Sequence, residues 1–299
     1  MLYTNERKLC KLQDRLPTVI SDIGKPDMSI PTGIASLDDK MNGLYPSDLI
    51  VIGGRPSMGK SSLLTDIALY ISRNRHVLIF SLEMTAYNLT QRMLCNLAGV
   101  SLFKLRKNTL TERELCDINN TSKVLYKPDN YNISIDETTR ITPDDMEETI
   151  SMLNDSGDKV DCVLIDYIQL MGLRSSCENR NQELSVISRQ LKAIANKFGI
   201  PVVVLSQLNR SVEYRENRRP LMSDLRDCGS IEQDADVVLL LYREGYYTRV
   251  NNPDAIDNGT AEMILTKVRN GATGIAVATW DAEGMSFNPR LRLNMEDNF

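Results

Sequence analysis

A glycine-rich stretch that ends in a lysine and a serine is the most distinctive chemical feature of the chain. Residues 54–61 read Gly-Arg-Pro-Ser-Met-Gly-Lys-Ser, between an apolar run at 49–53 and an apolar helical pattern at 60–72. Glycines let a backbone approach an anion, and the N–H groups of such a loop and of the following helix donate to phosphate oxygens. Lys60 is placed to reach the β- and γ-phosphates of a nucleotide, and the Ser61 hydroxyl to bind Mg²⁺. The predicted nucleotide-binding residues are Gly54, Arg55, Pro56, Ser57, Met58, Gly59, Lys60, Ser61 and Ser62.

An aspartate ends a second apolar run, Val-Asp-Cys-Val-Leu-Ile at 160–165. Asp166 is therefore expected at the carboxyl end of a buried strand, where the carboxyl ends of neighbouring parallel strands also lie. A carboxylate there binds Mg²⁺ directly or through water. The alternative for Asp166 taken alone is a strand-end residue that caps a helix.

The residue that activates water is harder to choose. Some phosphate-loop ATPases carry a glutamate directly after this aspartate, but here that position is Tyr167. Carboxylates just beyond other strand ends are Glu83, Asp136, Glu137 and Glu244. We select Glu83 because it follows the strand after the phosphate-loop helix. A glutamate that only begins the helix at 88–98 explains the same residue about equally well.

Composition excludes several other kinds of chemistry. The 299 residues include one histidine, His76, which rules out a mechanism that needs a histidine pair. The six cysteines contain no C-x-x-C pair, so a reducing compartment is expected rather than a zinc site or a disulfide framework. No apolar run approaches the roughly 18 residues of a membrane span, and a cytoplasmic protein without a membrane partner is expected. The net charge of −5 leaves room for a local basic patch.

Alternating apolar runs predict an α/β fold with a mainly parallel central sheet flanked by helices. Strand candidates lie at 49–53, 77–81, 160–165, 201–206 and 237–242, and helical patterns at 60–72, 88–98, 142–154 and 179–198. Nearly continuous apolar strands indicate that both faces of the sheet are covered. Thr142 followed by Pro143 predicts a helix start. Residues 261–268 and 274–280 predict an antiparallel hairpin around Asn270-Gly271.

Six segments in order, across residues 30–290, resemble the C-terminal motor domain of DnaB-type replicative DNA helicases of bacteria and phages, a RecA-like family. They are residues 54–61, Ser-Leu-Glu-Met at 81–84, Ile-Asp-Tyr-Ile-Gln-Leu at 165–170, Ser-Gln-Leu-Asn-Arg at 206–210, Gly-Ser-Ile-Glu-Gln-Asp-Ala-Asp at 229–236 and Lys-Val-Arg-Asn-Gly at 267–271. The resemblance implies a RecA-like motor over 31–299 that uses ATP or another NTP with Mg²⁺. It also implies a ring-shaped hexamer that moves 5′-to-3′ on single-stranded DNA and unwinds duplex, with a primase and a helicase loader as partners, in the cytoplasm of a bacterium or a phage-infected host.

The same resemblance assigns roles to single residues. Glu83 matches the family's catalytic glutamate, and Gln207 matches a sensor that links nucleotide state to the DNA-side loop. Lys267 and Arg269 resemble a cationic pair that enters the neighbouring subunit's nucleotide site, where such fingers are worth about 10³ to 10⁵ in rate. From composition alone, Lys267 and Arg269 would be solvated strand charges.

Positive charge gathers between residues 206 and 226, the arginine-rich segment, which holds five arginines and three acidic residues. A ring of such segments could follow a phosphate backbone without reading bases; a mobile surface loop is the equal alternative. Arg210 is our DNA-binding candidate here. In the family, DNA phosphates meet the loop matched by Arg226, Asp227 and Gly229. Asp227 and Cys228 stand where Glu and Ser are usual. A backbone N–H contact tolerates these changes, but a side-chain contact from residue 227 would be weakened or altered.

Residues 1–30 are expected to form a linker helix and connector. Leu9, Leu12 and Leu16 recur at helical spacing, interrupted by Pro17, and we expect this helix to dock on the next subunit of a ring. Family members normally carry a separate helical domain before the linker, and only about 30 residues precede the motor here. Two other functions remain as alternatives: a RecA-like regulatory or recombination ATPase, and a non-motor helicase-like accessory subunit.

Overall fold

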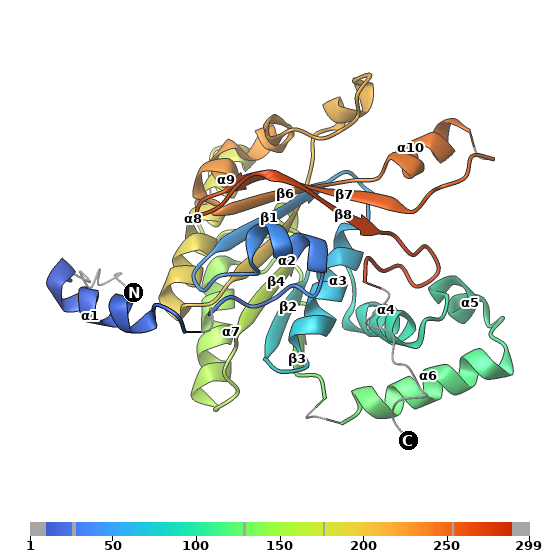
Figure 1. Ribbon diagram of the computed structural model, residues 1–299, viewed down its shortest axis with the longest axis horizontal. Coiled ribbons are helices and arrows are strands. Elements are labelled where there is room, and N and C mark those ends of the chain that lie inside the picture. Colours follow the sequence, from blue (N-terminus) through green and yellow to red (C-terminus); the bar gives the residue numbers. More distant parts are fainter. Residues whose placement is uncertain (1–9, 26–27, 128–129, 176, 253, 289–299) are drawn as a thin grey trace.

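A single sheet forms the centre of the molecule. The computed structural model describes residues 10–25, 28–127, 130–175, 177–252 and 254–288, without the side chains of 226–230. Within these ranges the sheet has eight strands in the order β3-β2-β4-β5-β1-β6-β7-β8 (Figure 1). The strands are β1 Leu49–Gly54, β2 Val77–Ser81, β3 Ile133–Asp136, β4 Cys162–Asp166, β5 Val202–Gln207, β6 Val237–Tyr242, β7 Thr260–Val268 and β8 Gly274–Thr279. Strands β1 to β6 pair in parallel, whereas β7 and β8 are antiparallel.

Helices cover both faces of this sheet. The α-helices are α1 Leu12–Asp22, α2 Ala35–Met41, α3 Lys60–Ile71, α4 Ala86–Ala98, α5 Leu102–Lys107, α6 Glu112–Leu125, α7 Pro143–Asp155, α8 Arg180–Phe198, α9 Gly229–Asp234 and α10 Glu244–Asn251. Short 3₁₀ helices are η1 Ile168–Leu170, η2 Arg210–Tyr214 and η3 Met222–Cys228. Helices α2, α3 and α4 share one hydrophobic core with the sheet, and α7, α8 and α9 share the other.

The strand sequences build both cores at once. Leu49 and Val51 of β1 belong to the core under α7 and α8, whereas Ile50 and Ile52 belong to the core under α3. Because successive strand side chains point to opposite faces, a continuous apolar run is what a sheet buried on both sides requires. The expected α/β fold with a C-terminal hairpin is therefore confirmed, with strand and helix boundaries within two residues of those predicted.

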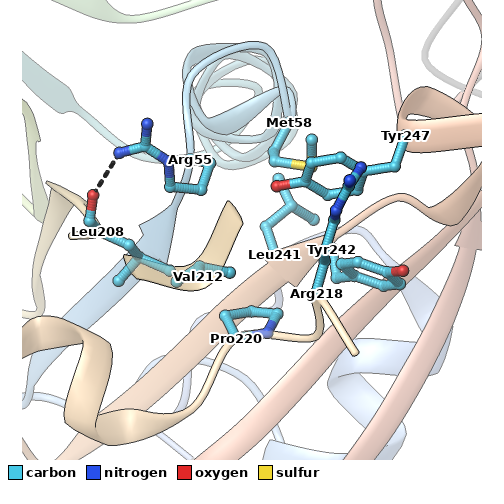
Figure 2. Close-up of a pocket in the computed structure, with 9 residues that line it drawn as sticks. All are labelled: Arg55, Met58, Leu208, Val212, Arg218, Pro220, Leu241, Tyr242 and Tyr247. Atoms are coloured by element: carbon cyan, nitrogen blue, oxygen red, sulfur yellow. Dashed lines mark hydrogen bonds between the residues drawn. The ribbon is translucent and has the colours of Figure 1, made fainter. Parts of the chain in front are cut away.

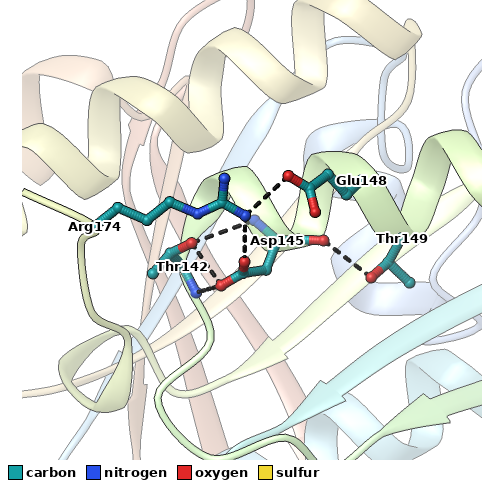
Figure 3. Close-up of polar contacts among 5 residues, drawn as sticks. All are labelled: Thr142, Asp145, Glu148, Thr149 and Arg174. Carbon is teal, nitrogen blue, oxygen red and sulfur yellow. Dashed lines mark hydrogen bonds and ion pairs between the residues drawn. The ribbon is translucent and has the colours of Figure 1, made fainter. Parts of the chain in front are cut away.

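Helix α7 begins where Thr142 predicts. The Thr142 hydroxyl accepts from the Asp145 backbone N–H at 3.3 Å, and the Asp145 carboxylate accepts from the Thr142 N–H at 2.9 Å (Figure 3). Arg174, beyond η1, donates to Asp145 at 2.6 Å and to Glu148 at 2.9 Å. Hydrogen bonds from Thr142 and then from Arg174 hold the pKa of Asp145 below its usual value. These contacts tie the segment that follows β4 to the start of α7.

Several features differ from the sequence expectation, which also lacked the short helices α2, α9 and α10. Strand β3 was not expected, because it is a four-residue, half-buried edge strand without an apolar run. Helix α1 continues through Pro17 instead of being interrupted there, since a proline removes one backbone donor and leaves the other bonds of the helix in place. Helices α5 and α6 were also not expected; α6 begins with a capping box between Thr111 and Glu114.

Helix α1 lies at the periphery, apart from the sheet (Figure 1). None of its residues is buried, and Leu12, Leu16, Val19 and Ile20 are all exposed. Leu9, the first leucine of the expected pattern, lies outside the described residues. In the described ranges, no helix combines the length and apolarity needed to cross a bilayer.

Candidate active site

The phosphate loop, Asp166, Glu83 and Gln207 meet at the edge of the sheet where the parallel strands end. In the strand register, Gly54 at the end of β1 lies opposite Gln207 at the end of β5. Ser81 at the end of β2 lies opposite Asp166 at the end of β4. The Leu82 N–H donates to the Asp166 carbonyl at 2.9 Å, which places the following Glu83 beside the same edge. This edge is the usual place for a ligand in a parallel sheet.

The phosphate loop, residues 54–61, needs glycine at 59. Gly59 has φ of +98°, and a Cβ there would meet the Phe287 ring at 2.7 Å. The loop leads directly into α3, so the helix N-terminus faces the same space as the loop backbone. Pro56 and Ser57 are exposed, whereas Ser62, in the first turn of α3, is buried.

Lys60 lies within this loop in an apolar setting. Its ammonium donates to the Arg55 carbonyl at 3.1 Å. Burial lowers the pKa of Lys60 to about 8, although the charges of Asp166 and Glu83 act in the opposite direction. A lysine at the start of a helix is suited to binding an anion, because the helix N-terminus adds partial positive charge.

Ser61 and Asp166 bring two oxygen ligands together. The Ser61 hydroxyl is hydrogen-bonded to the Asp166 carboxylate, whose pKa is raised by burial. Hydroxyl and carboxylate oxygens are the ligands that Mg²⁺ prefers, together with substrate phosphates and water. These two residues therefore fit the expected metal. Asp166 is not a helix cap, because η1 begins after Tyr167 without a side-chain cap.

Of the four carboxylates considered for water activation, Glu83 lies nearest to this chemistry. Its charge acts on Lys60 and on Asp166. Glu137 instead accepts from the Ala86 N–H at the start of α4, and Asp136 accepts from the Thr138 N–H. The α4 cap is Thr85 and its first turn holds no acidic residue, so Glu83 does not serve as a helix-start glutamate. The geometry supports Glu83, and its catalytic role stays a prediction.

Gln207 is exposed at the end of β5, beside the phosphate loop. Its backbone is held by Gln169 of η1, a residue that sequence reasoning did not assign. The Gln169 amide donates to the Gln207 carbonyl at 3.2 Å and accepts from the Gln207 N–H at 3.2 Å. Gln169 lies in the segment 165–170 quoted for the resemblance, so that segment carried the signal.

The side chains of Arg55 and Met58 do not face the helix N-terminus. The Arg55 guanidinium donates to the Leu208 carbonyl at 2.7 Å (Figure 2). Its Nε donates to the Glu213 carboxylate at 2.9 Å. Met58 lines a small cavity together with Leu208, Val212, Arg218 and Pro220 of the arginine-rich segment (Figure 2). Both residues were predicted to bind nucleotide, and only their backbone groups are placed for it, because their side chains are engaged with this segment.

Lys267 and Arg269 lie at the other end of the strands, away from the phosphate loop. Lys267 donates to the Glu232 carbonyl at 2.7 Å, and Arg269 forms an ion pair with Asp236 at 2.7 Å. These contacts are made at the start of β6, whereas the phosphate loop lies level with its end. A chain therefore does not bring these cations to its own phosphate loop.

The DNA-binding candidates lie on the segments that follow β5. Arg210 is exposed at the start of η2. Arg226 and Asp227 belong to η3 and Gly229 begins α9, but the side chains of 226–230 lie outside the described residues. Other arginines of the segment are already engaged: Arg215 with Asp224, Arg218 with the Tyr247 ring and Arg219 with Glu262. Fewer arginines of the segment are therefore available to an anion than the count of five indicates.

Two further arginines near the site carried no sequence signal. Arg92 of α4 lies close enough to Asp166 and Glu83 to feel both charges, and its Nε has no hydrogen-bond partner among the described residues. Arg243, after β6, stacks on the Trp280 ring at 4.4 Å and pairs with Asp257 at 2.9 Å. Burial lowers the pKa of both guanidinium groups.

Comparison with known proteins agrees with this geometry. The family model described as DnaB-like helicase C terminal domain matches residues 29–289. The replicative DNA helicase DnaB of Geobacillus stearothermophilus is 41% identical over 274 residues, which are 90% of this chain and 57% of the relative. The helicase of the same name from Buchnera aphidicola subsp. Baizongia pistaciae is 38% identical over 261 residues, 87% of this chain and 55% of the relative. The chain thus spans little more than half the length of these curated relatives.

Solved structures show the same fold. One that is described as an ATPase domain superposes with a TM-score of 0.84 at 28% identity, over 93% of this chain and 98% of that one. A DnaB-like replicative helicase described with its interactions with primase gives the same TM-score and identity, over 93% of this chain and 68% of that one. With the match over residues 29–289, these likenesses show that the chain belongs to the DnaB-like helicase C-terminal domain family, with a RecA-like fold.

Proposed function

We propose that this chain is the motor of an ATP-driven replicative DNA helicase. The observation that carries the proposal is the meeting, at one sheet edge, of the phosphate loop, Asp166, Glu83 and Gln207, with the arginine-rich segment starting directly after Gln207. The candidates for phosphate, metal and DNA binding therefore lie together at the same end of the parallel strands. Membership of the helicase family supports the same conclusion.

ATP hydrolysis at this edge would divide among the chain's residues as follows. The loop backbone and Lys60 bind the phosphates, and Ser61 with Asp166 would hold Mg²⁺, which neutralises phosphate charge when bound. Glu83 orients a water and accepts its proton as the water oxygen attacks the γ-phosphorus. The bond to the β–γ bridging oxygen breaks, which leaves ADP and inorganic phosphate. Gln207 lies where an amide can contact the γ-phosphate and report its loss to the following segment.

A second copy of the chain would complete the site. Lys267 and Arg269 would enter the nucleotide site of a neighbour and stabilise the charge that develops during transfer. Each copy would then donate cations from one end of its strands and receive a neighbour's cations at the other end, which supports a ring. Six subunits are proposed, as the resemblance to the family implies. Single-stranded DNA would pass through it along Arg210, Arg226, Asp227 and Gly229, tracked 5′-to-3′ by its phosphates.

DNA-stimulated ATP hydrolysis tests this function. The wild-type chain should hydrolyse ATP faster when single-stranded DNA is added, and Lys60→Ala should abolish most of that rate. Equal rates in the two proteins would reject the site. A forked duplex with a 5′ or a 3′ tail then tests the direction, and unwinding from the 5′ tail is expected. ATP hydrolysis that DNA does not stimulate would favour a regulatory ATPase, and no hydrolysis would favour an accessory subunit.

Helix α1 is proposed to hold neighbouring subunits together. Its exposed apolar side chains, among them Leu12 and Ile20, belong to none of the cores that the described residues form. Burying such surface on a second copy would stabilise the assembly by roughly 25 cal/mol per Å². A chain shortened to begin at Ser29 should form a smaller or weaker oligomer by light scattering. An unchanged mass would refute this role.

Further partners follow from the proposed role in replication. A primase and a helicase loader are expected, and one of the solved relatives is described with primase. The place of action would be the cytoplasm of a bacterium or of a phage-infected host. Pull-down of a purified primase by the oligomer, with the Ser29-start chain as a comparison, measures that contact.

A further inference from the structure

Arg55 joins the phosphate loop to the arginine-rich segment through two different parts of the residue. Its backbone carbonyl accepts the hydrogen bond from the Lys60 ammonium at 3.1 Å. Its guanidinium donates to the Leu208 carbonyl at 2.7 Å and contacts the Glu213 carboxylate at 2.8 and 2.9 Å. One residue thus contacts the lysine that binds phosphate and the η2 turn that begins at Arg210.

The guanidinium end of this link is well fixed. The Arg55 side chain is 7% exposed, and a buried guanidinium without its partners would be costly. Arg55 and Arg218 both lie near enough to the Tyr247 ring, together with Glu213, to act on its hydroxyl. Val212 of η2 lines the same small cavity as Arg55 (Figure 2). A displacement of Arg55 therefore moves η2 or breaks these contacts.

The other end of the link responds to phosphate. The Lys60 ammonium has three donor hydrogens, one of which the Arg55 carbonyl accepts, and a nucleotide phosphate that binds the ammonium draws it away from that carbonyl. Loss or weakening of that hydrogen bond changes the preferred position of the Arg55 backbone, and with it the position of the guanidinium.

We propose that Arg55 and Glu213 are positioning residues that couple phosphate binding at Lys60 to DNA binding by the segment that begins at Arg210. The inference rests on the proposed function. It adds a second connection between the nucleotide site and the DNA-binding segment, one that does not pass through Gln207. Gln207 is held by Gln169 on the β4 side, whereas the Arg55–Glu213 pair acts on η2 farther along the segment. By linkage, DNA must alter nucleotide affinity by the same factor as nucleotide alters DNA affinity.

The test measures that factor in both directions. The dissociation constant of a fluorescein-labelled oligothymidylate is measured with and without AMP-PNP and Mg²⁺, and that of a fluorescent AMP-PNP analogue with and without oligothymidylate. The ratio in each direction is the coupling factor. The variants are Glu213→Ala, Glu213→Gln, Arg55→Gln and the double variant Arg55→Gln/Glu213→Gln. Glu216→Ala is the matched control, because it removes an exposed carboxylate from the same segment.

Glu213→Ala should lower the coupling factor about fivefold, the low end of the range for coupled sites, because the carboxylate is partly exposed. Glu213→Gln, which keeps the oxygen acceptor, should lower it less, and Glu216→Ala should leave it unchanged. The double variant should lose no more than Arg55→Gln alone, since the pair acts as a unit. Nucleotide affinity without DNA should stay within about twofold in Glu213→Ala, which a general loss of structure would not allow.

Two results would overturn the inference. If Glu213→Ala and Glu213→Gln keep the wild-type coupling factor in both directions, the pair does not transmit phosphate binding. If the two substitutions of the double variant act additively, the residues act separately. A wild-type chain whose oligothymidylate affinity is the same with and without AMP-PNP would instead overturn the proposed function, and the inference with it.

Discussion

Arg269 should act only in the site of another subunit, and a mixing experiment can show it. Gly54 of the phosphate loop lies level with Leu241 of β6, which pairs with Met263 of β7. Arg269 follows Met263 by six residues, or about 20 Å at the usual rise of roughly 3.3 Å per strand residue. That separation is far longer than an arginine side chain, so a nucleotide site that uses Arg269 needs two chains.

The magnitudes follow from this arrangement. Arg269→Ala should lower the rate of ATP hydrolysis by about 10³-fold or more, the usual worth of an arginine finger, and spare nucleotide binding. The loss of the ion pair with Asp236 should cost less than about 1 kcal/mol of folding stability, because the Arg269 side chain is 59% exposed. Glu83→Gln should be equally inactive by losing the water-activating carboxylate.

Mixing the two inactive chains should restore activity. A site is intact when its phosphate loop belongs to an Arg269→Ala chain and its neighbour is a Glu83→Gln chain. Random assembly of equal amounts gives that arrangement at about one site in four, so roughly a quarter of the wild-type rate is expected if sites act independently. Arg249→Ala, in an exposed arginine of α10, is the matched control and should be fully active. A mixture no faster than its two components, with wild-type oligomer mass, would refute a shared site.

Two pH effects follow from burial at α3. Nucleotide should bind less tightly as the pH rises through about 8, by up to about tenfold per pH unit, because Lys60 then loses its proton. The measurement is a titration with fluorescent nucleotide from about pH 6.5 to about 9.5. The pH dependence of the affinity should vanish in Lys60→Ala. Burial raises the pKa of Asp66 from 3.8 to about 6, so its protonated form stabilises the fold below about pH 4 and that contribution is lost as the pH rises through 6. Relative to Asp66→Asn, the wild type should therefore lose about 2 kcal/mol of unfolding free energy between pH 4 and pH 7, measured by urea denaturation; a constant difference would contradict the buried carboxyl.

The sequence predicts the centre of the sheet well and its margins poorly. Strands β1, β2, β4, β5 and β6 are apolar runs because both their faces are buried, and this pattern is visible without a structure. The apolar-run pattern does not predict strand β3, because this edge strand is only half-buried and its sequence alternates Ile-Ser-Ile-Asp. Helices α5 and α6 pack with the end of α4 on a small cluster apart from the two main cores, so their apolar faces are narrow.

The candidate site shows the same division. The spacing of 54–61 and the terminal position of Asp166 are local features, and the structure brings the two segments together where the sheet topology requires. The direction of the Arg55 side chain is not local, because its partner Glu213 is 158 residues away along the chain. Gln169 and Arg92 likewise depend on which elements pack together, and residue type alone does not reveal that.

The two edges of the sheet also limit the kinds of assembly that can work. In a two-fold dimer one patch meets its own copy, so the phosphate loop and Arg269 would both have to lie in that patch. They lie at opposite edges of the strands, about 20 Å apart. A head-to-tail interface satisfies both requirements, and such an interface closes into a ring or continues as a filament. The smallest fully active species should therefore hold more than two chains, as light scattering during steady ATP hydrolysis would report. An active dimer would show that the cations reach the nucleotide by a different arrangement of the chains.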